Sequence, residues 1–202
     1  YKIKAITAYV YEKFLENIDK DFAKREGLLF VGGFAHPPNA SAVLWFAKEI
    51  FPLIRQRIDV NFYVVGSKVT DEIKALEQPG SGIIVKGFVT EEELASLYST
   101  SRIVVVPLRY GAGVKGKVVE AVYNGSAIVT TSIGSEGIPE AERVMKVADG
   151  PEAFADEVVK MYQDPAECRR MCEETQKYIR EYFSVEAAWK VIEGDFTPEK
   201  KR

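Results

Sequence analysis

Two lysines and three glycines stand close together where an apolar run ends and a helical pattern begins. They are Gly111, Gly113, Lys115, Gly116 and Lys117, directly after the apolar residues 103–106. A strand-to-helix junction of this kind offers free backbone N–H groups and the positive end of a helix dipole. Because the same small volume also holds two ammonium groups, the segment favours a phosphate or diphosphate ligand.

The charges around this junction support an anion site. The positive end of a helix dipole disfavours cations unless an anion lies near, so Lys115 and Lys117 are unusual as ordinary helix-start residues. Glu120 follows three residues after Lys117 and therefore shares its helix face. A nucleotide's ribose hydroxyls need an acceptor such as this carboxylate, although a solvent-facing helix residue is the simpler alternative for Glu120.

Apolar runs of strand length recur along the chain, and each is followed by Gly or Pro and then a helical pattern. We expect strands at 28–31, 61–65, 83–85, 103–106 and 127–130, with a weaker one at 144–147. These runs are rich in β-branched residues and barely alternate in polarity, which is typical of strands covered on both faces.

Helical patterns fill the stretches between the runs and the end of the chain. They cover residues 4–24, 41–57, 71–76, 91–99, 117–124, 151–163, 165–182 and 184–194, with Pro52 expected to kink or divide the second. The alternation predicts an α/β fold: a Rossmann-like, doubly wound, mostly parallel sheet of about six strands with helices on both faces and a helical C-terminal segment.

In an open parallel sheet of this kind, ligands bind beyond the carboxyl ends of the strands. The chain's unusual residues gather in those loops, and the topology should bring several loops to one rim. The further candidates for ligand binding are Gly32, Gly33, His36, Asn39, Gly66, Lys68, Arg109, Ser132, Gly134, Ser135 and Glu136.

Several of these candidates also have a purely structural interpretation. Gly32 and Gly33 can relieve a tight turn. His36 is the single histidine of the chain, and Lys68 suits a solvated loop. The loop 132–137 fits a plain turn as well as a nest of N–H donors.

Two common nucleotide signatures fail. Residues 111–117 match the first seven positions of a P-loop, but Val118 stands where Ser or Thr should hold magnesium. The dinucleotide fingerprint fails as well, because Gly32-Gly33 is not followed by the third glycine and no acidic residue ends the next strand.

Composition limits the partners. The 202 residues carry a net charge of −3, which argues against nucleic acid or an anionic membrane as main partner. No stretch approaches the length of a membrane span, so membrane contact is not indicated, and no carboxylate cluster suits magnesium. Cys168 and Cys172 are spaced four apart on one expected helix, so we interpret them as helix-face thiols in a reducing, cytoplasmic setting.

Taken together, the loops resemble the carboxy-terminal, nucleotide-sugar-binding half of GT-B glycosyltransferases, specifically the group 1 (family 4) retaining enzymes. The resemblance spans Gly27 to Phe183. Its motifs are Phe30-Val31-Gly32-Gly33-Phe34 with Pro38-Asn39, Val64-Val65-Gly66, Val85-Lys86-Gly87-Phe88, Pro107–Gly125, and Thr130-Thr131-Ser132-Ile133-Gly134-Ser135-Glu136-Gly137.

The resemblance implies roles for particular residues. Glu120 matches the second Glu of the family's Glu-x7-Glu motif, which holds the ribose, whereas Ala112 stands where the first Glu faces the donor sugar. Lys115 and Lys117 are the implied catalytic residues, since they and the nearby N–H groups would stabilise the leaving diphosphate. Neither metal nor cofactor is implied, and the donor itself is a nucleoside-diphosphate sugar.

The resemblance also implies an organisation. We expect a helical interdomain connector at 1–27, the donor-binding domain at 28–183, and a C-terminal helix and tail at 184–202. The partner half, an N-terminal acceptor-binding domain, does not fit into the first 27 residues, so this chain corresponds to the donor-binding half of a glycosyltransferase, inactive by itself. The alternative is a non-catalytic nucleotide-binding or regulatory module with degenerate donor loops; a GT-B sugar epimerase is disfavoured by the single histidine.

Overall fold

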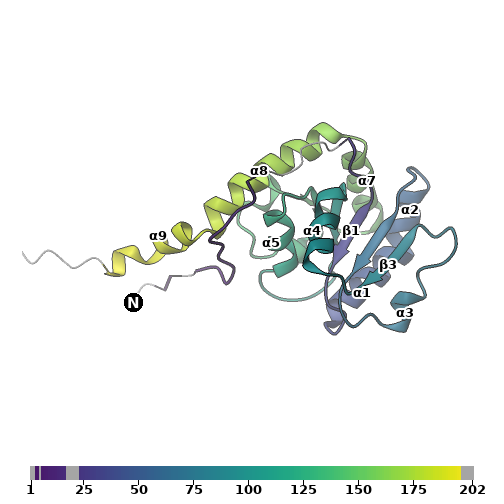
Figure 1. Ribbon diagram of the computed structural model, residues 1–202, viewed down its shortest axis with the longest axis horizontal. Coiled ribbons are helices and arrows are strands. Elements are labelled where there is room, and N and C mark those ends of the chain that lie inside the picture. Colours follow the sequence, from purple (N-terminus) through teal and green to yellow (C-terminus); the bar gives the residue numbers. More distant parts are fainter. Residues whose placement is uncertain (1–2, 5, 17–22, 197–202) are drawn as a thin grey trace, which may run out of the picture.

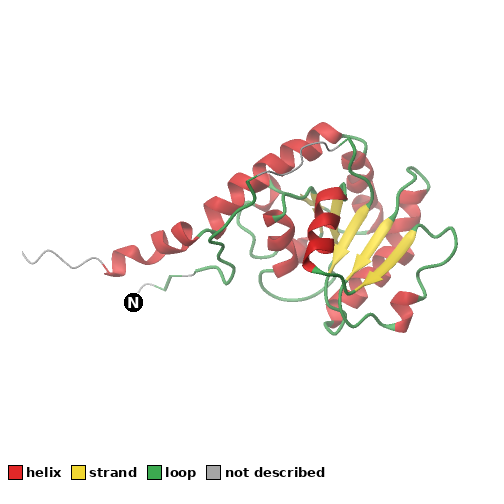
Figure 2. Cartoon of the chain, viewed as in Figure 1, coloured by secondary structure: helices red, strands yellow, loops and turns green. Residues whose placement is uncertain are grey.

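Six strands form one sheet in the computed structural model. The structure describes residues 3–4, 6–16 and 23–196, and helices surround the sheet (Figures 1 and 2). The spatial order is β3-β2-β1-β4-β5-β6, and all neighbours pair in parallel. The strands are β1 (Leu28–Val31), β2 (Phe62–Val65), β3 (Ile83–Gly87), β4 (Ile103–Val106), β5 (Ile128–Thr130) and β6 (Lys146–Val147). The predicted doubly wound sheet is therefore confirmed.

The direction of winding reverses between the two central strands. β1 pairs with β2 on one side and with β4 on the other, with Leu28 beside both Phe62 and Ile103. Loops that follow β1 and β4 therefore leave toward opposite faces of the sheet, and a crevice opens between them. All four residues of β4 are buried, which explains why its sequence is a continuous apolar run.

Helices cover both faces of the sheet. One face carries α1 (Pro37–Trp45), the π-helical turn η1 (Phe46–Ile50), α2 (Phe51–Arg55) and α7 (Pro151–Tyr162), and the other carries α4 (Glu91–Thr100) and α5 (Gly116–Tyr123) (Figure 1). The short elements α3 (Asp71–Lys74), α6 (Ser132–Ser135) and the 3-10 turn η2 (Ala141–Arg143) lie in connections.

Pro52 divides the helical stretch after β1, as the sequence predicts. Proline lacks an N–H group, and its ring crowds the carbonyl four residues earlier. The chain responds with the π-helical turn before the proline and a new helix, α2, that carries Pro52 in its first turn. Phe46 of the π-helical turn packs on Phe62 with ring centroids 4.6 Å apart and on Phe154 at 5.9 Å, which anchors this irregular segment in the core.

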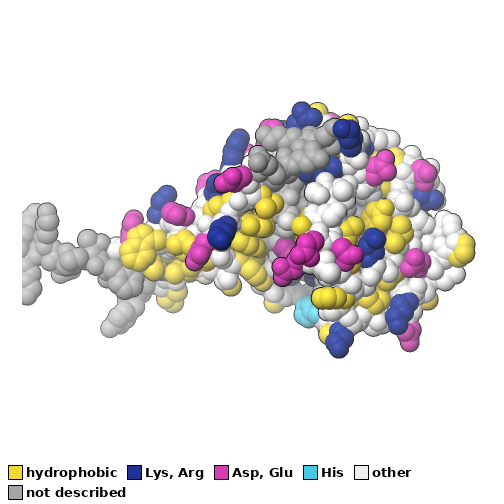
Figure 3. Space-filling view, in the orientation of Figure 1, with side chains coloured by type: hydrophobic (Ala, Val, Ile, Leu, Met, Phe, Trp, Pro, Cys, Tyr) yellow, Lys and Arg dark blue, Asp and Glu magenta, His cyan; other side chains and the backbone are white. Residues whose placement is uncertain are grey.

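The last two helices extend from the α/β body. α8 (Pro165–Phe183) packs on α5, and α9 (Val185–Phe196) projects away from the sheet (Figure 1). Asp164 and Ser184 act as N-caps, accepting hydrogen bonds from the Glu167 and Ala187 amides at 3.0 and 2.9 Å. Apolar side chains lie exposed on α9, where Trp189 keeps 51% of its surface accessible (Figure 3).

The segment before β1 is not the expected helix. Residues 3–4, 6–16 and 23–27 contain no helix, so the prediction for 4–24 is wrong over them, and the remainder of that stretch lies outside the described residues. The Tyr11 amide instead donates to the Phe183 carbonyl at 2.8 Å, and Tyr11 forms a bridge to Ser184. Tertiary pairing thus overrides the helical spacing of apolar residues. Among the described helices, none has the length and apolar character of a membrane span.

Candidate functional site

A cavity of about 280 Å³ opens beside the loops that follow β1 and β4. It is lined by Tyr9, His36, Pro38, Asn39, Leu108, Tyr110, Gly111, Ala112, Val114, Lys115, Gly116 and Lys117. This is the crevice at the reversal of strand order, where ligands of open α/β sheets bind. The structure therefore brings both predicted lysines, His36 and Asn39 to one place.

A larger cavity of about 440 Å³ lies near the amino-terminal ends of the strands and includes Arg102. That guanidinium serves the fold, since its three nitrogens donate to the carbonyls of Arg25, Tyr162 and Ala23 at 2.8, 2.8 and 3.0 Å. It also stacks on the Tyr162 ring at 4.6 Å. We therefore interpret this cavity as structural, despite its size.

Lys117 is a partly buried cation without an acidic partner among the described residues. Its ammonium group donates to the amide oxygen of Asn39 and lies 5.5 Å from the centre of the Phe30 ring. Burial and the neighbouring Lys115 lower the pKa of Lys117 to about 8, while Glu120 opposes the shift. A buried ammonium that a neutral amide holds in place can accept an anion at little reorganisation.

Lys115 has a different environment. Its side chain is only 10% exposed, and its ammonium group pairs with Glu136 at 2.9 Å while also donating to the Gly113 carbonyl. The Glu136 carboxylate is half exposed. The predicted residue Glu136 therefore reaches the site, where its carboxylate competes with any anionic ligand for Lys115.

The backbone amides at the start of α5 are open. The backbone N–H groups of residues 111–117 donate no hydrogen bond to another residue in the described part of the chain, although the side chains of Lys115 and Lys117 do. The N-cap, Lys115, supplies no capping side-chain bond. The orphan N–H groups of a helix N-terminus thus point at the same cavity as Lys117, which is the arrangement of an anion site.

Loop 132–137 is different, because the protein already uses the donors of Ser132, Gly134 and Ser135. The Ser132 amide and hydroxyl both donate to Asp149, at 3.0 and 3.1 Å. The Gly134 amide donates to the Thr131 hydroxyl at 3.2 Å, and the Ser135 amide to the Thr131 carbonyl at 3.0 Å. The structure therefore supports the plain turn over the nest of donors for Ser132, Gly134 and Ser135.

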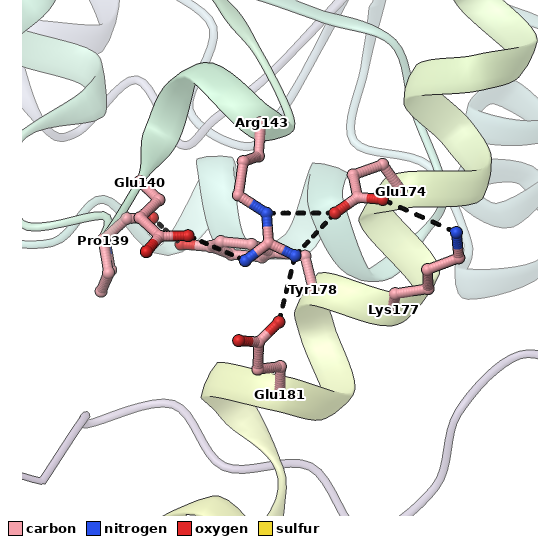
Figure 4. Close-up of polar contacts among 7 residues, drawn as sticks. All are labelled: Pro139, Glu140, Arg143, Glu174, Lys177, Tyr178 and Glu181. Atoms are coloured by element: carbon pink, nitrogen blue, oxygen red, sulfur yellow. Dashed lines mark hydrogen bonds and ion pairs between the residues drawn. The ribbon is translucent and has the colours of Figure 1, made fainter.

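The loop that carries Glu136 is held onto α8 by an ionic cluster around Arg143 (Figure 4). Arg143 pairs with Glu140 at 2.8 Å, with Glu174 at 2.6 Å and with Glu181 at 3.1 Å. These carboxylates raise the pKa of Arg143, whose guanidinium also lies over the Tyr178 ring. A network of this kind fixes geometry better than an isolated surface pair does.

Glycine is required where the loop after β1 meets the loop after β2. A Cβ at Gly66 would stand 1.9 Å from the Gly32 carbonyl oxygen, and the φ angle there is +154°. A Cβ at Gly32 would stand 2.9 Å from the Asn39 amide nitrogen. Gly66 thus supports the site through the loop after β1 and does not line the cavity itself.

Glu120 lies one turn further along α5 and is absent from the described lining of the cavity. Burial raises the pKa of its carboxyl group, and Lys117 partly opposes the shift. Glu120 in turn contributes to the raised pKa of Tyr11. Glu120 and Lys117 therefore interact electrostatically, and the ribose role of Glu120 stays a prediction.

Three other predicted residues lie further from the lysines or make no polar contact there. Arg109 donates to the Ser41 hydroxyl at 2.7 Å and lies 5.7 Å from the Trp45 ring centre, so it faces α1. Lys68 is exposed with a left-handed φ of +59°. His36 lines the cavity as the exposed N-cap of α1 but forms no capping bond (Figure 3).

Tyr9 lines the cavity from a segment in which the sequence analysis placed no site residue. The available signal was the pair Tyr9 and Tyr11, two residues apart, because an extended chain directs such a pair to one side. The expectation of a helix concealed it.

Comparison with known proteins agrees with this geometry. The family described as glycosyl transferases group 1 matches residues 25–164. A Klebsiella pneumoniae protein of 44.6 kDa from the cps region is 32% identical over 116 residues, which cover 54% of this chain and 30% of the relative. The match thus spans less than a third of that relative's length.

Solved structures share the fold. S. aureus TarM in complex with UDP superposes with a TM-score of 0.74 at 15% identity, over 96% of this chain and 39% of that one. The pneumococcal O-GlcNAc transferase GtfA, in complex with UDP and GlcNAc, gives 0.65 at 16% identity, over 92% and 38%. The C-terminal domain of the group 1 protein LpcC from Francisella tularensis gives 0.62 at 19% identity, over 90% of this chain and 99% of that domain. Because the family match covers more than half of the 202 residues, this chain belongs to the glycosyl transferases of group 1, which have the GT-B fold.

Proposed function

We propose that this chain is the donor-binding half of a retaining glycosyltransferase and binds a nucleoside-diphosphate sugar in the cavity beside the loops that follow β1 and β4. One observation carries the proposal. The open amides at the start of α5 and the Lys117 ammonium face one cavity, and no acidic side chain among the described residues pairs with Lys117. A diphosphate supplies the missing negative charge.

The family and the similar structures support a nucleotide ligand. TarM and GtfA were both solved with UDP bound. In our proposal Lys115 and Lys117 hold the diphosphate, and Glu120 accepts a hydrogen bond from the ribose. Asn39 lines the cavity and orients Lys117, and the loop with Gly32 and Gly33 holds Asn39 in place.

For transfer, the same groups act on the departing oxygen. Negative charge develops there as the bond to the sugar breaks, and Lys117 with the fixed amides of residues 113–117 stabilises it without reorganisation. Lys115 joins them once it leaves Glu136. Neither a metal nor a cofactor has a role in this scheme.

The acceptor has to be held by a second domain, because transfer requires both substrates in near-attack geometry. We propose that this domain is part of the same polypeptide and contacts the apolar side chains of α9, among them Val185 and Trp189. The protein then works in a reducing compartment such as the cytoplasm, where the buried side chains of Cys168 and Cys172 stay thiols.

A second candidate function is nucleotide binding without transfer. Ala112 favours it, since this methyl side chain lines the cavity where the family resemblance places a donor-sugar carboxylate. Turnover of a UDP-sugar by the longer protein separates the two: transfer supports the enzyme, and binding without turnover supports the binding module.

Calorimetric titration with UDP tests the binding proposal. We expect Lys117→Ala and Glu120→Ala to weaken binding at least about tenfold, since each removes a charge-assisted contact. Lys48→Ala is the matched control, because Lys48 forms only an exposed pair with Glu72 on the helix surface. Absence of nucleoside diphosphate binding to the wild type, or equal binding by all four proteins, contradicts the proposal.

A further inference from the structure

The extended segment before β1 places a phenol group at the start of α5. The Tyr9 hydroxyl oxygen lies 2.7 Å from the point where a Cβ at residue 116 would stand, so the space above Gly116 is occupied by this side chain. Tyr9 lines the same cavity as Lys115 and Lys117. Its hydroxyl makes no hydrogen bond with another residue in the described ranges.

Tyr11 holds this segment in place. Its ring stacks on Tyr123 of α5 with centroids 4.4 Å apart and planes within 17°, and its amide bonds to the Phe183 carbonyl at 2.8 Å. Side chains two residues apart in an extended chain lie on the same side. Anchoring Tyr11 on the C-terminal end of α5 therefore directs Tyr9 toward the N-terminal end of the same helix.

The surroundings of the hydroxyl select its chemistry. A phenol can donate one hydrogen bond and accept others, and the groups that line the same cavity include the backbone amides at the start of α5 and the ammonium groups of the two lysines, all donors. The lysines already donate to Asn39, Gly113 and Glu136, whereas the backbone amides have no acceptor among the described residues. A ligand that accepts several hydrogen bonds, such as a phosphate, supplies what these amides lack.

We propose that Tyr9, which lies outside the sheet, is a binding residue for the diphosphate and donates a hydrogen bond from its hydroxyl group to a phosphate oxygen. This inference rests on the proposed function and extends it to the segment before β1. The ligand then contacts three separate parts of the chain: Tyr9, the loop after β1 and the start of α5. Binding of a diphosphate thus fastens the segment before β1 onto the domain.

The test compares Tyr9→Phe with the wild-type chain in titrations with UDP and with uridine. Loss of one hydrogen bond to a charged acceptor should weaken UDP binding about tenfold. Uridine, which has no phosphate, should bind both proteins equally, because the hydroxyl is assigned to the phosphate alone. Tyr63→Phe is the control, since it removes a hydroxyl from a tyrosine at the opposite end of the strands.

A merely structural role for the hydroxyl makes a different prediction. In that case Tyr9→Phe unfolds at a lower temperature without ligand and binds both UDP and uridine more weakly. That result overturns the proposal. Unchanged or tighter UDP binding by Tyr9→Phe also overturns it, and tighter binding would identify Tyr9 as an obstruction. If the wild type binds UDP and Lys117→Ala does not, these results refute the role of Tyr9 alone; if the wild type binds no nucleoside diphosphate, the proposed function itself fails.

Discussion

The Lys117 ammonium group donates to the amide oxygen of Asn39, while the amide nitrogen of Asn39 donates to the Gly33 carbonyl at 2.7 Å. Asn39 is only 4% exposed and thus orients the lysine from a fixed position. This relationship joins α1 to α5 across the reversal of strand order. It keeps a cation in the cavity without neutralising it.

Asn39→Asp tests whether that neutrality matters. The new carboxylate pairs with the Lys117 ammonium group, raises the pKa of Lys117 and neutralises its positive charge. UDP affinity at pH 7 should therefore fall at least about tenfold. Repulsion between the carboxylate and the Gly33 carbonyl should also cost about 1–3 kcal/mol of stability. Calorimetry well below the unfolding temperature measures the first effect and thermal unfolding the second. The charge-matched control Asn61→Asp, at an exposed position, should bind UDP as the wild type does; undiminished binding by Asn39→Asp refutes the argument.

UDP affinity should depend on pH through Lys117. Because the pKa of Lys117 is lowered to about 8, its charge is present below that pH and is lost as the pH rises through it. If only the protonated form binds, affinity at pH 9 is about tenfold weaker than at pH 7. Titrations at constant ionic strength measure this change. Lys117→Arg keeps its charge throughout and should bind equally at both values; a wild type as insensitive as this variant excludes the titration of Lys117 as the cause.

Glu136→Gln should strengthen UDP binding. The substitution releases Lys115 from its ion pair, and partly exposed pairs contribute up to about 1 kcal/mol, so the gain should reach at most about fivefold. Glu142→Gln, which removes the same charge from an exposed position after the same loop, separates this local effect from a change in net charge. Weaker binding by Glu136→Gln would show instead that the carboxylate positions Lys115 for the ligand.

Gly66→Ala should destabilise the fold strongly. Its Cβ would stand 1.9 Å from the Gly32 oxygen at a φ of +154°, so the loops after β1 and β2 must separate, at a cost of roughly 3 kcal/mol or more. Gly80→Ala is the control: its φ of +79° is also strained, but no atom lies within 4 Å of the added Cβ. Denaturant unfolding compares them, and similar losses would mean that strain, and not the close approach, makes glycine necessary at Gly66.

Much of the site was readable from the chain because parallel sheets place ligands at strand ends. The buried runs fixed the strands, and the cationic, glycine-rich turn at 111–117 stood out locally. The prediction that Lys117 faces an anion needs no tertiary contact, because a cation at a helix N-terminus opposes the dipole. The break at Pro52 followed from backbone chemistry in the same way.

Other features depend on contacts between distant residues, and local patterns carry no information on these. Glu136 pairs with Lys115, and Asp149 takes the donors of Ser132, although nothing in either segment specifies its partner. The Arg109 guanidinium lies over the ring of Trp45 in α1, a contact that the sequence around Arg109 does not specify.

The amino-acid sequence by itself determined the sheet, the order of its elements and the lysine-bearing turn, since periodicity and turn chemistry act over a few residues. Only the tertiary structure decided which groups surround that turn. The segment before β1 became extended and brought Tyr9 to the cavity because pairing with Phe183 and stacking on Tyr123 outweigh a weak helical pattern.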